Sequence, residues 1–140
     1  MKGIKHSAII AQPPARVFEV INDIESYPSF LPWCTHAKIL SRTEQEIVAT
    51  VGVRKGPLHG EFTTRNGLDP DKRISLQLVS GPFRTLEGEW LLTPIGENGC
   101  RAELSLRFEF KNALSGLLFE QKFAQTMASL VDAFVIRART

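Results

Sequence analysis

The strongest constraint on the fold is the alternation of apolar and polar residues through the middle of the chain. It is clearest at residues 102–110, where Ala, Leu, Leu, Phe and Phe alternate with Glu, Ser, Arg and Glu. Successive side chains of a strand point to opposite faces of a sheet, so this pattern predicts a strand buried on one face only. Similar runs begin at about Trp33 and are separated by turn signals such as Lys55-Gly56-Pro57. We therefore predict six antiparallel strands between residues 33 and 110.

One more strand and two short helical segments precede this region. Residues 4–11 predict a first strand, which Gln12-Pro13-Pro14 ends. Proline is favoured in the first turn of a helix, and apolar residues follow at helical spacing. We expect this helix to end near Asn22-Asp23. Two prolines four residues apart limit residues 27–33 to one helical turn or a compact loop.

The segment from Asn112 to Arg137 predicts one long helix. Its apolar residues recur at steps of three and four, from Leu117 to Val135. At 1.5 Å per residue such a helix is roughly 39 Å long, enough to cross a sheet. The expected fold is α+β: a seven-stranded curved antiparallel sheet wrapped around a long C-terminal helix, with two short helices after the first strand. With 140 residues, the chain is expected to form a single domain, residues 1–140.

Composition and motifs exclude several classes of protein. The net charge of +2 gives no reason to expect a DNA partner, and the longest uncharged apolar run, residues 113–119, is too short to span a membrane. Cys34 and Cys100 fit no metal or redox spacing and suggest a reducing compartment, so we expect a cytoplasmic protein without a metal site. No arrangement of Ser, His, Asp or Cys suggests a catalytic residue, so we expect no enzyme.

A sheet that grips one helix leaves space between the two. A helix about 10 Å wide does not fill the concave face of seven twisted strands, and pockets with apolar walls typically measure about 300–1,000 Å³. The alternative, which the pattern leaves open, is that the same side chains form an ordinary packed core. The candidate cavity-lining residues are Phe30, Trp33, Val51, Val53, Phe62, Leu76, Leu78, Phe83, Trp90, Leu104, Phe108, Phe119, Phe123, Met127 and Leu130.

Four stretches carry a distinctive combination of residues: Tyr-Pro-Ser-Phe-Leu-Pro-Trp-Cys at 27–34, Gly-Pro-Phe-Arg-Thr-Leu-Glu-Gly-Glu-Trp at 81–90, Arg-Phe-Glu-Phe at 107–110 and Ala-Phe-Val-Ile-Arg-Ala at 133–138. Together they resemble the coenzyme Q-binding, oligoketide cyclase-like branch of the START-like (SRPBCC) superfamily. This branch also includes the ribosome association toxins. The resemblance extends from about residue 3 to residue 138, and it implies the helix-grip fold with an elongated apolar cavity.

The resemblance implies two different functions. The first is non-catalytic binding of an isoprenoid quinone such as ubiquinone, as a bound ligand and not a required cofactor, in support of respiratory electron transport. The second is regulation of translation by binding the large ribosomal subunit and blocking subunit association. Quinone binding would use the interior, whereas ribosome binding would use outward Lys and Arg side chains. Transient contact with a membrane, at the periphery of the inner membrane, is left open.

A polyketide cyclase or aromatase is the third alternative. Such an enzyme needs positioned acid–base groups in its cavity, and the interior positions of every predicted strand read as apolar. Tyr27 is expected to be an anchored aromatic of a surface loop. The sequence does not give the identity or chain length of a ligand, the oligomeric state or a toxin role.

Overall fold

The computed structural model describes residues 2–139 and confirms the predicted α+β architecture. Met1 and Thr140, the two ends of the expected single domain, lie outside the described residues. The strands are β1 (Lys2–Ile10), β2 (Cys34–Arg42), β3 (Glu46–Lys55), β4 (Leu58–Asp69), β5 (Arg73–Ser80), β6 (Phe83–Ile95) and β7 (Gly99–Phe110). The helices are α1 (Pro14–Asn22), the single 3-10 turn η1 (Ile24–Ser26), α2 (Tyr27–Phe30) and α3 (Ala113–Arg137).

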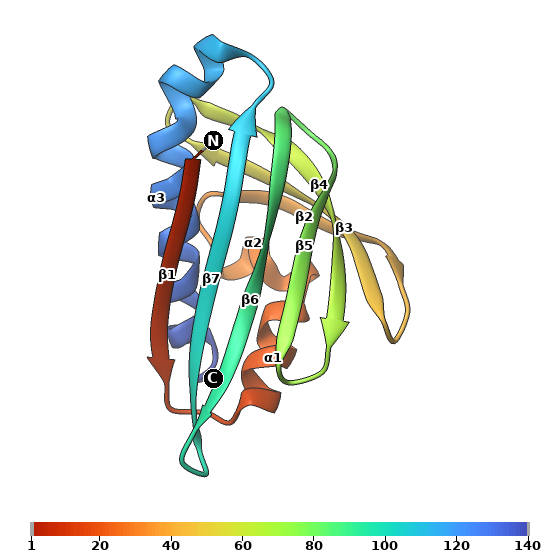
Figure 1. Cartoon of the computed structure of the whole chain (residues 1–140), viewed down its shortest axis with the longest axis vertical. Helices are drawn as coiled ribbons and strands as arrows, with labels where there is room; N and C mark the ends of the chain where they lie inside the picture. Colours follow the sequence, from red (N-terminus) through yellow and green to blue (C-terminus); the bar gives the residue numbers. More distant parts are fainter. Residues whose placement is uncertain (1, 140) are drawn as a thin grey trace.

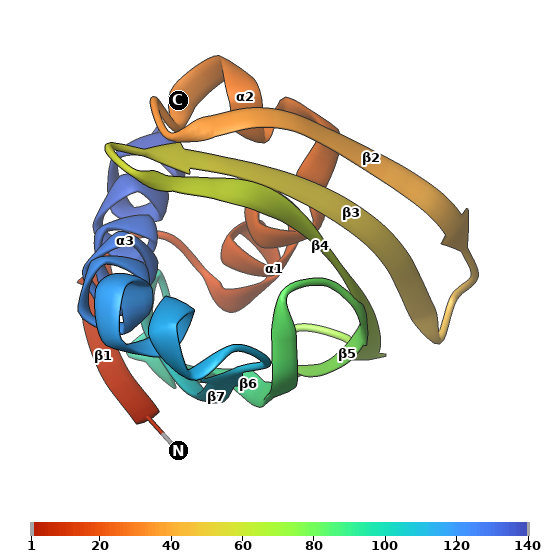
Figure 2. The same ribbon diagram turned by 90° about the horizontal axis from the view of Figure 1, so that it is seen from above.

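All seven strands form one antiparallel sheet in the order β1-β7-β6-β5-β4-β3-β2. Strands β2 to β7 form a meander, because each pairs with the next along the chain. Strand β1 instead pairs with β7, from Lys2 opposite Phe108 to Ile10 opposite Cys100. The sheet is strongly curved, so that β2, β3 and β4 lie across the interior from β1, β7 and β6 (Figure 2).

Helix α3 closes the open side of the curved sheet. It lies along β1 and β7 and does not cross all seven strands (Figure 1). The Asn112 side-chain oxygen accepts a hydrogen bond of 2.8 Å from the backbone N–H of Leu114 and so caps the first turn. On the solvent side, His6 Nε2 of β1 lies 3.2 Å from Asp132 Oδ1 of α3. Among the described residues, no helix has both the length and the apolar character that crossing a membrane requires.

The first two turns of α3 differ from the sequence prediction. The spacing predicted that Leu117 and Leu118 face the sheet, but they are 83% and 60% exposed. These turns project beyond the end of the strands (Figure 1), so no sheet surface lies beneath them. Full burial along α3 begins only at Phe123.

Two aromatic clusters occupy the interior on either side of its centre. In the first, the ring of Phe123 has its centroid 4.8 Å from that of Phe108 and 4.9 Å from that of Phe83. In the second, the rings of Phe134 and Trp90 lie 5.4 Å apart. Offset and edge-on ring contacts at these distances are favourable, and both clusters are buried. The larger of the spaces that remain between sheet and helices lies in the region between the clusters.

Candidate functional site

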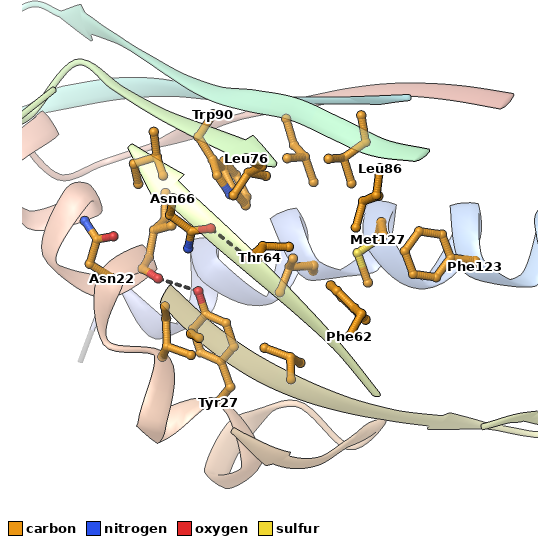
Figure 3. A pocket seen from close by; sticks show the side chains of 18 of the residues that line it. Asn22, Tyr27, Phe62, Thr64, Asn66, Leu76, Leu86, Trp90, Phe123 and Met127 are labelled. Atoms are coloured by element: carbon orange, nitrogen blue, oxygen red, sulfur yellow. Dashed lines mark hydrogen bonds between the residues drawn. The ribbon is translucent and has the colours of Figure 1, made fainter. Parts of the chain in front are cut away.

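A cavity of about 80 Å³ lies between the sheet and the helices. Its walls come from β3 to β7 on one side and from α1, η1, α2 and α3 on the other (Figure 3). The expected volume of about 300–1,000 Å³ is wrong for this structure, because the two aromatic clusters fill most of the interval with their own rings. The remaining space is large enough for a few water molecules or for a group the size of one ring.

Nine of the fifteen predicted residues line this cavity. They come from five strands, from α3 and from the segment after α2, and all nine are apolar or aromatic. They are Trp33, Val51, Phe62, Leu76, Trp90, Leu104, Phe123, Met127 and Leu130. Their contact with a ligand stays a prediction.

The other six predicted residues do not line the cavity: Phe30, Val53, Leu78, Phe83, Phe108 and Phe119. Phe30 packs on Phe134, with centroids 5.8 Å apart, and the Arg137 guanidinium lies 5.0 Å from its ring centroid. Val53 and Phe83 border a separate space of about 20 Å³. The others belong to the core or its margin, because the apolar spacing of an element does not distinguish a cavity wall from a packed interior.

Leu106, an apolar residue of β7 that the alternation also predicted to face inward, lines the cavity as well. Sequence reasoning missed nine lining residues: Ile21, Asn22, Ile24, Tyr27, Ala49, Thr64, Asn66, Ile74 and Leu86. Two of them correct the expectation that every interior strand position is apolar. Phe62, Thr64 and Asn66 alternate along β4 on one face, so the two polar residues point inward with the phenylalanine. This period of two was the signal that could have identified them.

Hydrogen bonds fix the polar side chains of the cavity. The Thr64 hydroxyl donates to Asn66 Oδ1 at 2.7 Å, and the Asn22 amide nitrogen donates to the Phe18 carbonyl at 3.0 Å. No lining side chain among the described residues carries a formal charge at neutral pH. Because burying an unpaired charge is costly, a lining of this kind suits a neutral guest.

Tyr27 is not the surface-loop aromatic that the sequence predicted. It is 9% exposed, and its hydroxyl donates to the carbonyl oxygen of Ile21. Burial, reinforced by the nearby Cys34 and Asp23, raises the pKa of Tyr27 well above its usual range. It is the one ionisable group among the described lining residues, so acid–base chemistry has a single buried phenol to use here.

The buried thiol beside Tyr27 is also poorly suited to chemistry. Cys34 is buried and free, and burial raises its pKa to about 11, although a hydrogen bond with the His36 backbone opposes this shift. A thiol with this pKa is almost entirely protonated at neutral pH and is a weak nucleophile. Within residues 2–139, no three His, Cys, Asp or Glu side chains are grouped so that they could hold a metal ion.

The outward face of the sheet carries charges that neutralise one another. Arg65 Nε lies 3.4 Å from a Glu46 carboxylate oxygen, and Arg107 Nε lies 3.3 Å from one of Glu87. Further pairs join Arg73 to Glu89 and Arg101 to Glu103. This face therefore offers little net positive charge to a polyanion.

A different surface, which we call the basic end, carries basic side chains that have no carboxylate partner among the described residues. Its members are Lys2, Arg54, Lys55, Arg84 and Lys111. They come from the ends of four strands and the turns beside them, near the start of α3 (Figure 1). All five are exposed, and none forms an ion pair among the described residues. Glu109 and Glu120 share a shallow groove with Lys2, Arg84 and Lys111, so the end is predominantly but not wholly positive.

The fold and the cavity define a class of protein. The chain belongs to the polyketide cyclase / dehydrase and lipid transport family, whose model matches residues 10–135. It also resembles a solved START superfamily protein from Mycobacterium smegmatis, with a TM-score of 0.82 and 20% identity over 98% of this chain and 97% of that one. The START-like resemblance and the fold it implied are thereby confirmed.

Two proteins that match this chain in sequence indicate which members of the family it resembles. The chain is 40% identical to the ribosome association toxin RatA of Escherichia coli K12 over 139 residues, which cover 99% of this chain and 88% of that protein. It is 26% identical over 124 residues to the mitochondrial coenzyme Q-binding protein COQ10 homolog B of Xenopus laevis, covering 85% of this chain and 50% of that protein. The names of both relatives indicate non-enzymatic roles, although the family description also covers cyclases and dehydrases.

Proposed function

We propose that this protein associates with the ribosome and regulates translation by binding the large subunit and blocking subunit association. The observation that carries the proposal is the near full-length likeness, at 40% identity, to a ribosome association toxin. The likeness to a coenzyme Q-binding protein is lower and covers less of the chain. The relatives therefore favour the second of the two sequence hypotheses over the first.

The distribution of charge supports the basic end as the surface that meets ribosomal RNA. RNA presents a dense row of phosphates, and exposed Lys and Arg side chains bind it with a strong dependence on salt. The outer sheet face is neutralised by its own glutamates, whereas the five side chains of the basic end have no carboxylate partner among the described residues. The small net charge of +2 is thus unevenly distributed.

Co-sedimentation with purified large subunits at several salt concentrations tests the proposal. Lys55→Glu, at the last residue of β3, should weaken binding and reduce the slope of log affinity against log salt by about one or more. Lys72→Glu is the matched control, because Lys72 is also an exposed lysine beside a turn of the meander but lies near the opposite end of β4. Absence of the wild-type protein from the subunit fraction would contradict the proposed function. Equal binding by the two variants would reject the basic end as the contact surface.

A second candidate function is binding of an isoprenoid quinone, which the neutral, apolar-walled cavity and the coenzyme Q-binding relative favour. A space of about 80 Å³ suits a ring-sized head group, so a polyprenyl tail requires the cavity to open. Burying such a tail is favourable by about 25 cal/mol per Å² of apolar area. Organic extraction of protein purified from its own host, followed by mass spectrometry, should recover a quinone. Repeated extracts without one would count against this function.

A further inference from the structure

One end of the cavity presents two hydrogen-bond donors that have no acceptor. Among the described residues, neither the Trp90 indole N–H nor the Asn66 amide N–H groups donate a hydrogen bond. Both side chains are deeply buried, at 4% and 7% exposure, and both line the cavity. Neither nitrogen is among the fully enclosed side-chain atoms that lack a partner, so both are open to the cavity. A guest in the cavity can therefore supply the acceptor that the protein does not.

The surrounding contacts fix what these donors face. The Thr64 hydroxyl occupies Asn66 Oδ1, which turns the amide nitrogen away from Thr64 and leaves both its N–H groups unused. The Trp90 ring is held against Phe134 at 5.4 Å. Asn66 and Trp90 come from β4 and β6, on either side of β5, and they face the same space (Figure 3). Both side chains therefore border the space that a guest would occupy.

The geometry points to a carbonyl-binding subsite in which Asn66 and Trp90 together donate to one oxygen of a neutral, ring-sized ligand. A carbonyl oxygen has two lone pairs and no proton, so it accepts from both donors and satisfies them. The uncharged walls disfavour a carboxylate or an amine. The chemical class is thus an apolar molecule with a carbonyl group, which includes quinones and aryl ketones.

This inference rests on the second candidate function, in which the cavity holds a ligand. It identifies Asn66 and Trp90 as the residues that select that ligand. It makes no use of the basic end or of the ribosome. Water could also satisfy the two donors, and a water-filled cavity would show no preference for a carbonyl compound. Binding experiments with a matched pair of probes therefore distinguish these cases.

Acetophenone and α-methylstyrene form such a pair, because they have nearly the same shape and differ by C=O in place of C=CH₂. Titration of the full chain, followed by ¹⁵N–¹H NMR, should show that acetophenone binds about tenfold more tightly, as expected for two net hydrogen bonds. The Trp90 indole proton signal, assigned with Trp33→Phe and Trp90→Phe variants, should move downfield with acetophenone and not with α-methylstyrene.

Variants separate the subsite from general apolar binding. Asn66→Leu should reduce the preference for acetophenone to about twofold and should bind α-methylstyrene at least as well as the wild type does. Gln77→Leu is the matched control, because it likewise replaces a side-chain amide with leucine, but on an exposed residue of β5, and it should keep the preference. Equal affinity of the wild type for the two probes would overturn the carbonyl subsite while leaving a ligand cavity. Failure of both probes to bind would overturn the subsite and weaken quinone binding as well.

Discussion

Phe123 offers the sharpest test of whether the interior between α3 and the sheet is packed or open. Its side chain is 2% exposed, and its ring lies 4.8 to 6.2 Å from the rings of Phe108, Phe83, Phe62 and Phe110. Replacing a buried phenylalanine with alanine costs about 3–5 kcal/mol, and loss of four ring contacts places Phe123→Ala at the upper end of that range. The free energy of unfolding should therefore fall by about 4–5 kcal/mol.

Urea unfolding, followed by far-UV circular dichroism, measures this change. With a slope of about 2 kcal/mol per molar urea, the midpoint should fall by roughly 2 M. Phe119→Ala is the matched control on the same helix, because Phe119 is partly exposed and has one aromatic contact, with Phe110 at 6.5 Å. It should cost less than about 1.5 kcal/mol. A Phe123→Ala variant that is no less stable than Phe119→Ala would refute the packed cluster and restore the large cavity expected from the sequence.

Three further predictions concern single residues. Gly88→Ala should lower the free energy of unfolding, measured by thermal denaturation, by at least about 2 kcal/mol, because the added Cβ would collide with the Ser105 carbonyl oxygen. Gly60→Ala is the control: its Cβ would meet open space, so the free energy of unfolding should change by less than about 0.5 kcal/mol. Tyr27 is the one tyrosine of the chain, so alkaline titration of tyrosinate absorbance reports it alone; its raised pKa predicts no ionisation until the protein unfolds, and a normal titration would contradict its burial. Burial raises the pKa of the Cys34 thiol from 9.0 to about 11, so the thiol ionises more readily in the unfolded chain than in the folded one. The stabilisation that the folded protein gains from the protonated thiol should therefore be complete below about pH 9 and should be lost as the pH rises to about 11. Iodoacetamide labelling of Cys34, read by mass spectrometry, should be slow at neutral pH, and rapid labelling of the folded protein would argue against a buried thiol.

The elements of the fold were predictable because their signals are local. Strict alternation over residues 102–110 predicts a strand, and these residues do lie in β7. The proline pair after Gln12 likewise predicted the start of α1. The packed part of α3 was not predictable from spacing alone. Leu117 and Phe123 share the same apolar character, and only the position where the strands end decides which of them is covered.

The polar end of the cavity and its volume were harder to predict. Thr64 and Asn66 were overlooked because polar residues were assigned outward, although they are in phase with Phe62 along β4. Tyr27 was misplaced because its neighbouring prolines suggested a surface loop, whereas its ring packs 5.5 Å from that of Phe134, a residue more than one hundred positions away. The cavity volume is a small difference between the space enclosed by the backbone and the side chains that fill it, so no pattern in the sequence determines it.

The pairing of the first strand with the last has a consequence for how the chain is made. Lys2 lies opposite Phe108, 106 positions later, so β1 has no partner while the chain between them is being synthesised. At roughly 5–20 residues per second, that interval is about 5–20 s. The meander from β2 to β7 can form in order of synthesis, whereas β1 joins an edge that does not exist until β7, Gly99–Phe110, has been translated. Strand β1 therefore stays unpaired until its partner strand β7 is synthesised, and a pause in elongation before residue 100 would prolong its exposure.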